Sequence, residues 1–289
     1  MTSLESIRGW VLDVDGCLVR TSRAGGRGGT AIPGAAEFLT AIKAAGHRVI
    51  VCTNASEKAP GVYADHLRDI GLAVEDEAFV TAGSATAEHI HAHHPGARVL
   101  AVGDEGITVP LRDLGVTPAS AADTVLADGL ADVVAVGAAP SYAAADLSAA
   151  ALAVDAGAAF YTTVETPWFH GGLGRSLAVS GAIAASITWA TGRSPMVGGK
   201  PSAVLAESLL RQLGLPPEQV AVVGDSPAEV GLARHMGALS VMVLSGAVTP
   251  TALADMTGGE RPDVVFDDVA DLHRHLGLSH HESQQGVVS

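Results

Sequence analysis

The chain has 289 residues and a formal net charge of −14 at pH 7, and 48% of its residues are hydrophobic. This length predicts two domains, because a single domain commonly takes about 100–200 residues. The strong negative charge argues against nucleic acid and anionic membranes as partners, since both attract clustered Lys and Arg. A site for a phosphorylated substrate would therefore have to supply its own local positive field.

The cysteines and the apolar stretches indicate the compartment. Cys17 and Cys52 are the only cysteines, and each lies at the end of an apolar run. Two such residues predict a reduced protein without a disulfide framework. The polar residues 1–8 do not resemble a signal peptide, and the uncharged stretch 177–190 is shorter than the roughly 20 residues of a membrane span. We therefore expect a soluble, cytoplasmic protein.

Short, continuously apolar runs alternate with amphipathic stretches along the chain. Such runs are typical of strands that are covered on both faces in a parallel sheet, and the stretches between them predict helices. We expect strands at 10–13, 48–53, 98–103, 132–137, 220–225, 240–245 and 264–266, and helices at 35–45, 62–70, 142–156 and 202–213. The alternation predicts an α/β protein with a parallel sheet.

The middle of the chain differs from its two flanks. The strands expected within residues 97–179 end in Gly103 and Gly137, without the acidic or hydroxyl clusters that follow strands elsewhere. We interpret this stretch as a second α/β unit inserted into the first. The expected organisation is a core formed by residues 1–96 and 180–289, with the inserted unit at 97–179.

Acidic side chains follow the first strand and a later one. Asp13 and Asp15 are two residues apart, so both side chains leave the same face of the strand. Carboxylates held this close repel each other unless a cation or a proton lies between them. A hard cation such as Mg²⁺ suits oxygen ligands, and Asp225 at another strand end would supply a further one.

Hydrogen-bond donors and a positive charge accompany these carboxylates in the sequence. Thr53 and Asn54 offer neutral donors, Lys200 offers a positive charge, and the turn at Gly16 offers backbone N–H groups. One Asp at a strand end is often no more than a helix cap or a solvated turn. A nucleophile, a metal ligand, a lysine and several donors in this order instead predict a site that holds a phosphoryl group.

These residues resemble the four motifs of the haloacid dehalogenase superfamily, in the order Asp13-Val14-Asp15-Gly16, Thr53, Gly199-Lys200-Pro201 and Gly224-Asp225. The position of the insert and the segments 32–35, 103–106, 190–193 and 197–202 are similar to the NagD-like, or 4-nitrophenylphosphatase, branch, which has a C2-type cap. The likeness covers about residues 9–275. It implies a Rossmann-like core with a mobile α/β cap, and it leaves a homodimer possible.

The resemblance assigns a role to each motif residue. Asp13 would attack phosphorus and form an aspartyl-phosphate, and Asp15 would protonate the leaving alkoxide and then activate water. Mg²⁺ would be held by Asp13, the Asp15 backbone carbonyl and Asp225. The phosphoryl oxygens would be held by Thr53, Asn54 and Lys200, together with the amides at Gly16.

Two segments depart from the pattern of the branch. Ala228 and Val230 stand where relatives usually carry acidic residues, so Glu229 remains to supply any second carboxylate, which we expect to act through a water molecule. In the cap, the loop 162–170 differs from the usual one, and we expect it to select the substrate. Its candidate residues are Glu165, Trp168, Phe169 and His170.

Two charged segments have competing interpretations. Arg20, Arg23 and Arg27 lie in the glycine-rich segment 20–29, which could contact an anionic substrate, although a flap with solvated charges is the simpler interpretation. His89, His91, His93 and His94 could bind zinc, but no cysteine accompanies them. Basic side chains at the end of a helix are the simpler explanation there.

The favoured function is a Mg²⁺-dependent phosphomonoesterase acting on a small phosphorylated metabolite, such as a sugar, polyol or nucleoside monophosphate. One alternative is a phosphotransferase or mutase, which would pass the phosphoryl group to an acceptor. The other is a non-catalytic sensor that binds a phosphorylated ligand. The presence of both Asp13 and Asp15 argues against the sensor.

Overall fold

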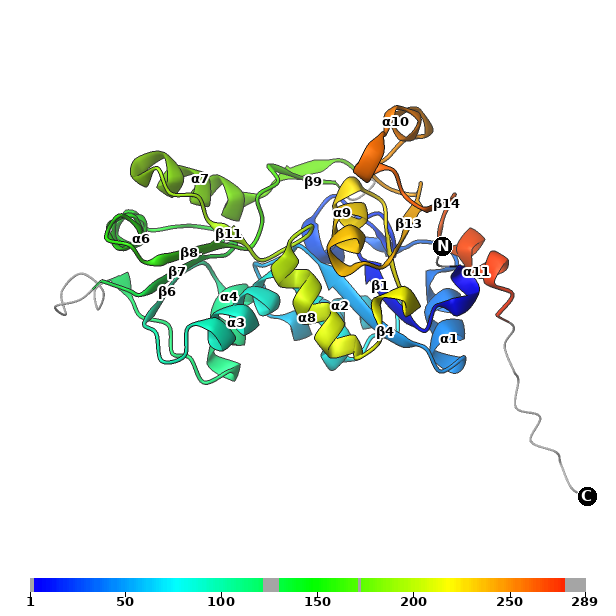
Figure 1. Ribbon diagram of the computed structural model, residues 1–289, viewed down its shortest axis with the longest axis horizontal. Helices are drawn as coiled ribbons and strands as arrows, with labels where there is room; N and C mark the ends of the chain where they lie inside the picture. Colours follow the sequence, from blue (N-terminus) through cyan, green and yellow to red (C-terminus); the bar gives the residue numbers. More distant parts are fainter. Residues whose placement is uncertain (1–2, 122–129, 171–172, 279–289) are drawn as a thin grey trace, which may run out of the picture.

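The computed structural model describes residues 3–121, 130–170 and 173–278. Figure 1 shows two α/β units side by side. The larger unit, the core, is built on a parallel sheet of six strands in the order β14-β13-β12-β1-β4-β5. Its strands are β1 (Gly9–Asp13), β4 (Arg48–Thr53), β5 (Phe79–Thr81), β12 (Val220–Gly224), β13 (Leu239–Val243) and β14 (Val264–Phe266).

Helices cover both faces of the core sheet. The helices of the core are α1 (Ala35–Ala44), α2 (Pro60–Asp69), α3 (Ala82–His93), α8 (Ala203–Leu213), α9 (Pro227–Met236), α10 (Pro250–Asp255) and α11 (Val269–Leu276). Side chains of β1 alternate between the two layers: Trp10 and Leu12 pack with α1, α2 and α11, whereas Val11 packs with α8 and α9. This double burial is why the strand carries no polar side chain before Asp13.

The smaller unit, the cap, has a parallel sheet of its own in the order β11-β8-β7-β6. Its elements are β6 (Val99–Val102), α4 (Glu105–Asp113), β7 (Val133–Val136), α6 (Ala144–Asp155), β8 (Ala159–Thr162), α7 (Val179–Thr191) and β11 (Met196–Val197). Helices α6 and α7 cover one face, and α4 covers the other together with part of α3. The expected α/β class and the inserted unit therefore correspond to the observed architecture.

The limit expected at residue 179 does not coincide with this sheet. Strand β11 pairs with β8, and Ala184 and Ile187 of α7 pack in the cap's own hydrophobic cluster. The cap sheet thus extends to about residue 197. Strand β11 has two residues and is half exposed, so its sequence lacks the long apolar run that predicts a buried strand.

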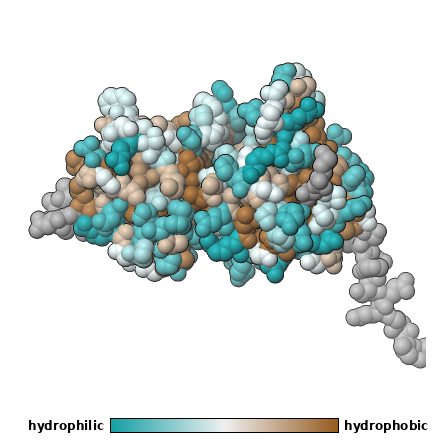
Figure 2. Space-filling model, in the orientation of Figure 1, coloured by the Kyte–Doolittle hydropathy of each residue, from teal (hydrophilic) through white to brown (hydrophobic). Residues whose placement is uncertain are grey.

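Two small antiparallel ribbons lie outside these sheets. Strands β2 (Val19–Arg20) and β3 (Thr30–Ala31) flank a flap that contains a short 3-10 turn at Ala24–Gly26. Strands β9 (Trp168–His170) and β10 (Arg175–Leu177) form the second ribbon, and β9 is drawn in Figure 1 between α7 of the cap and α9 of the core. On the face drawn in Figure 2, hydrophilic residues are spread over both units, with hydrophobic residues scattered between them.

The strands and helices predicted from the sequence are present, with small shifts at their ends. The helix expected at 62–70 begins at Pro60, because proline favours the first turn of a helix. No helix among the described residues is long and apolar enough to cross a membrane.

Candidate active site

Three buried carboxylates converge at the carboxyl ends of neighbouring core strands. Asp13 ends β1, Asp225 follows β12, and Glu229 reaches back from the first turn of α9. Their ligand oxygens lie within 4.8 Å of one another, and each residue is at most 6% exposed. An all-oxygen set of this kind fits a hard divalent cation.

Glu229 is held in the cluster by its place in a capping box. Its Oε2 accepts hydrogen bonds from N of Ser226 at 3.1 Å and from Oγ of Ser226 at 2.7 Å. The Ser-x-x-Glu spacing at a helix start is a sequence signal for this motif. The capping box turns the carboxylate back towards the strand ends, so Glu229 lies among the acidic groups directly.

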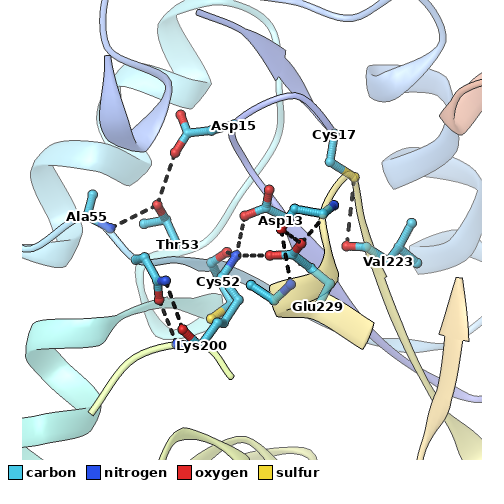
Figure 3. Close-up of polar contacts among 12 residues, drawn as sticks. Asp13, Asp15, Cys17, Cys52, Thr53, Ala55, Lys200, Val223 and Glu229 are labelled. Carbon is cyan, nitrogen blue, oxygen red and sulfur yellow. Dashed lines mark hydrogen bonds and ion pairs between the residues drawn. The ribbon is translucent and has the colours of Figure 1, made fainter. Parts of the chain in front are cut away.

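Lys200 supplies the positive charge of the cluster, as Figure 3 shows. Its ammonium group donates a hydrogen bond to the Asp13 carboxylate and lies 2.8 Å from Oε1 of Glu229. It also donates to the carbonyl oxygen of Cys52 at 3.3 Å. Burial alone would lower the pKa of Lys200, but attraction to Asp13 and Glu229 outweighs it and raises the pKa well above its ordinary value. Lys200 therefore stays positively charged.

The carboxyl groups carry raised pKa values for a different reason. Burial raises the pKa of Asp13 to about 8; Lys200 opposes this shift, while repulsion from Glu229 and Asp15 adds to it. Burial, followed by repulsion from Asp13 and Glu229, raises the pKa of Asp225 well above its ordinary value. More negative charge is collected here than one lysine can balance, and a bound cation would remove the imbalance.

Asp15 points away from this cluster in Figure 3, so its side chain is not among the grouped metal-ligand candidates. Its two carboxylate oxygens accept hydrogen bonds from the backbone N–H groups of Gly25 at 2.8 Å and Gly26 at 2.7 Å, both in the flap. Thr53 Oγ1 donates to the same carboxylate at 3.4 Å. Burial raises the pKa of Asp15, and the two flap amides partly oppose the shift.

Asn54 and Gly16 act on the surrounding backbone. The Asn54 amide accepts a bond from N of Lys200 at 2.7 Å and donates to O of Lys200 at 3.2 Å, so it fixes the lysine's position. The Gly16 N–H donates to the Val19 carbonyl at 2.8 Å and is engaged in the turn. A Cβ at Gly16 would lie 2.2 Å from Oδ2 of Asp225, so the glycine leaves room for that carboxylate.

A cavity of about 800 Å³ opens over these strand ends. The cap loop forms its opposite wall, with Glu165, Trp168, Phe169 and His170 lining it together with Asp13 and Lys200. The substrate-selecting residues expected from the sequence are thus brought to the candidate catalytic groups. Arg20 is exposed on β2 and lines none of the three described cavities, whereas Arg23 and Arg27 line a neighbouring one.

The observed cluster brings Glu229 together with Asp13 and Asp225, the two carboxylates expected to hold Mg²⁺. The side chain of Asp15, which was expected to act as acid and base, lies outside the cluster. The capping-box spacing could have placed Glu229 among these carboxylates, in addition to the expected role through a water molecule. The flap amides that hold Asp15 had no sequence signal, because backbone donors are the same at every residue. Only the fold shows which of them reach a carboxylate.

Comparisons with known proteins agree with this geometry. The family description "Haloacid dehalogenase-like hydrolase" matches residues 10–117, and a second one of the same kind matches residues 197–272. The acid sugar phosphatase of Staphylococcus epidermidis is 30% identical over 225 residues, which cover 77% of this chain and 80% of the relative. The chain belongs to the haloacid dehalogenase-like hydrolases.

Solved structures of this family share the fold over nearly the whole length. The 4-nitrophenylphosphatase of Thermotoga maritima superposes with a TM-score of 0.82 at 27% identity, covering 94% of this chain and 98% of the other. NagD of E. coli superposes with a TM-score of 0.78 at 27% identity, covering 92% of this chain and 98% of the other. The NagD-like likeness expected from the sequence motifs is thereby confirmed.

Proposed function

We propose that this phosphatase of the haloacid dehalogenase family is a Mg²⁺-dependent phosphomonoesterase that works through an aspartyl-phosphate on Asp13. The observation that carries the proposal is the buried group of Asp13, Asp225 and Glu229 beside Lys200, open to an 800 Å³ cavity. Mg²⁺ held there by the carboxylates would neutralise charge on the phosphoryl group. Lys200 would balance the remaining charge.

The first half-reaction forms the bond between an Asp13 carboxylate oxygen and phosphorus. The bond from phosphorus to the leaving oxygen breaks, and the leaving alkoxide takes a proton from Asp15. In the second half-reaction Asp15 takes a proton from water, which attacks phosphorus and releases phosphate from Asp13. The raised pKa of Asp15 suits the acid step, and the flap amides that stabilise its carboxylate suit the base step.

The cavity lining favours an uncharged, hydroxylated leaving group, such as a sugar or polyol. Lys200 is the only Lys or Arg among its described lining residues, and Glu165 adds a negative charge on the cap side. Trp168 offers a ring on which an apolar sugar face can stack, and Arg175 lies 4.3 Å from the centroid of that ring. The acid sugar phosphatase relative is consistent with this class of substrate.

The direct test is hydrolysis of 4-nitrophenyl phosphate by the metal-free protein, with and without added Mg²⁺. We expect activity to require Mg²⁺ and to disappear in Asp13→Asn. Stoichiometric phosphate release without an acceptor distinguishes a hydrolase from a phosphotransferase or mutase. Binding without turnover would instead indicate a sensor. Activity that neither metal removal nor Asp13→Asn changes would contradict the mechanism.

The acid role of Asp15 has its own test. Acid catalysis contributes roughly 10²–10⁴-fold and matters most when the leaving group is a poor one. Asp15→Ala should therefore lose most of its turnover of alkyl phosphates and keep more of its turnover of 4-nitrophenyl phosphate. Equal losses on both substrates would leave Asp15 without the proposed role.

Localisation and assembly extend the same proposal. Cys17 and Cys52 are both free and buried, which suits the reducing cytoplasm. We place the enzyme there. The homodimer stays a prediction, which light scattering of the purified protein would test.

A further inference from the structure

A second group of potential metal ligands lies outside the active site, where α3 and α8 run next to each other. His89 and His93 are four residues apart on α3, so they share one face of that helix. Glu207 of α8 faces them. One ring nitrogen of each histidine and a carboxylate oxygen of Glu207 all lie within 4.8 Å of one another. The sequence indicated the two histidines, but only the fold adds the third ligand.

The two imidazoles lie close together but are stacked, so the rings must turn before both nitrogen lone pairs point at one ion. Their ring centroids are 3.9 Å apart and the rings are inclined by 22°. Nδ1 of His93 lies 3.0 Å from the carbonyl oxygen of His89. A carbonyl can only accept, so Nδ1 carries the hydrogen, and in the neutral ring Nε2 is left with its lone pair. Fixing the tautomer of a histidine through its other nitrogen is the usual way in which proteins prepare a metal ligand.

Glu207 is not committed to another strong partner. Among the described residues its ion pair is with Arg211, one helical turn away, at 3.9 Å. That guanidinium is bound more closely by Glu88, at 2.7 Å. The Glu207 carboxylate is exposed and can therefore move towards the two rings at little cost. Two imidazoles and one carboxylate, with the remaining positions open to water, suit a borderline transition-metal ion better than Mg²⁺.

We propose that His89, His93 and Glu207 form a second metal site, which binds a divalent transition-metal ion of the Zn²⁺ class independently of the active-site carboxylates. The two histidines belong to the helix that packs on the cap, and Glu207 belongs to a core helix. An ion at this site joins α3 to α8. Its expected role is structural, because it fixes the helix on which part of the cap rests.

The test is a titration of the metal-stripped, tag-free protein with Zn²⁺. Excess Mg²⁺ is present throughout, so that the active-site carboxylates are already occupied. Equilibrium dialysis gives the number of bound ions, and Co²⁺ substitution gives a visible spectrum that reports histidine ligation. We expect His93→Gln and Glu207→Gln each to lower the affinity for one bound Zn²⁺ ion by at least about tenfold. Loss of a residue that only hydrogen-bonds a metal ligand already lowers metal affinity by that much. Thermal unfolding should show stabilisation by Zn²⁺ in the native protein and much less of it in these two variants.

His91→Gln is the matched control, because His91 is an exposed histidine of the same helix that does not belong to the group. This variant should bind the same Zn²⁺ ion with unchanged affinity and should give the same Co²⁺ spectrum as the native protein. The chain has 12 histidines, so the difference between the variants, and not the total amount of zinc bound, is decisive. Identical Zn²⁺ binding by His93→Gln, Glu207→Gln and His91→Gln would overturn the proposal, as would a Co²⁺ spectrum that all three variants share.

Discussion

The ammonium group of Lys200 lies 2.8 Å from Oε1 of Glu229. Glu229 therefore balances the lysine and adds a third carboxylate to Asp13 and Asp225. We expect Glu229→Gln, which keeps the shape and removes the charge, to raise the Mg²⁺ concentration for half-maximal activity by about tenfold or more, because charge count sets cation affinity. Glu218→Gln, an exposed glutamate outside the site, is the control. Equal Mg²⁺ titration curves for the two variants would show that Glu229 does not contribute to the metal site.

The glycines of the flap provide a test of how Asp15 is positioned. Gly25 has a φ of 73°, and a Cβ there would meet Cε1 of Tyr63 at 2.5 Å. Gly25→Ala should displace the turn and withdraw an N–H group from Asp15. A hydrogen bond to a charged group is worth about 1.5–3 kcal/mol, so we expect a loss of roughly 10- to 100-fold in kcat on alkyl phosphates, and less on 4-nitrophenyl phosphate.

Gly28→Ala is the matched control for this variant. Gly28 has a similar φ of 68°, but a Cβ there meets nothing within 4 Å. Both substitutions introduce backbone strain, whereas only that of Gly25 forces a contact beside Asp15. If the two variants lose the same activity on both kinds of substrate, strain alone explains the effect and the flap does not position Asp15.

The buried carboxyl groups predict a pH-dependent stability in the metal-free protein. Burial raises the pKa of Asp13 to about 8, from 3.8 in an unfolded chain. The stability that this group contributes is complete below the unfolded pKa and is lost as the pH rises through the folded pKa. Between about pH 6 and pH 8 the metal-free protein should lose up to about 1.4 kcal/mol per pH unit for each such proton.

Mg²⁺ replaces these protons, so it should stabilise the protein more at about pH 8 than at about pH 6. Thermal unfolding in EDTA and in Mg²⁺ at the two pH values measures the difference. Comparing the two conditions at each pH cancels the titration of histidines elsewhere. Asp13→Asn should reduce the pH dependence in EDTA. A stabilisation by Mg²⁺ that is the same at both pH values would contradict the raised pKa values.

The cap loop should act through substrate affinity. Trp168 lines the main cavity, so Trp168→Ala should raise KM for the best sugar or polyol phosphate up to about tenfold, the worth of one aromatic contact. KM for 4-nitrophenyl phosphate should change less. Trp189, which is 88% exposed on α7, provides the control Trp189→Ala. Equal effects of the two substitutions on KM would show that Trp168 does not contribute to substrate selection.

The core of the fold could be predicted because burial leaves a pattern in the sequence. Strand β1 is apolar at every position before Asp13, since both of its faces are covered. Strands β9 and β10 have three residues each and are largely exposed, so they lack that pattern. They were therefore not predicted, although β9 carries Trp168 and His170 into the site.

The chemistry of the candidate site was easier to predict than its contacts. Asp13 and Thr53 end core strands and Asp225 follows one, and the ends of parallel strands meet at one edge of a sheet. Lys200 comes shortly before α8. The bonds from Asn54 to the backbone of Lys200 join residues 146 positions apart. Such pairings depend on the packing of the whole domain, which leaves no local signal.

Helix α3 sets a limit on how the cap can be exchanged between relatives. Ala85 packs in the core cluster with α8 and α9, whereas Ala87 and Ile90 pack against cap residues such as Val99 and Ile107. A chimera joined at residue 97 would pair the α3 of one protein with the cap floor of another. Grafts that carry α3 with the cap keep the contacts of Ala87 and Ile90 and should fold better than grafts joined at residue 97, which leave mismatched apolar surfaces and should aggregate.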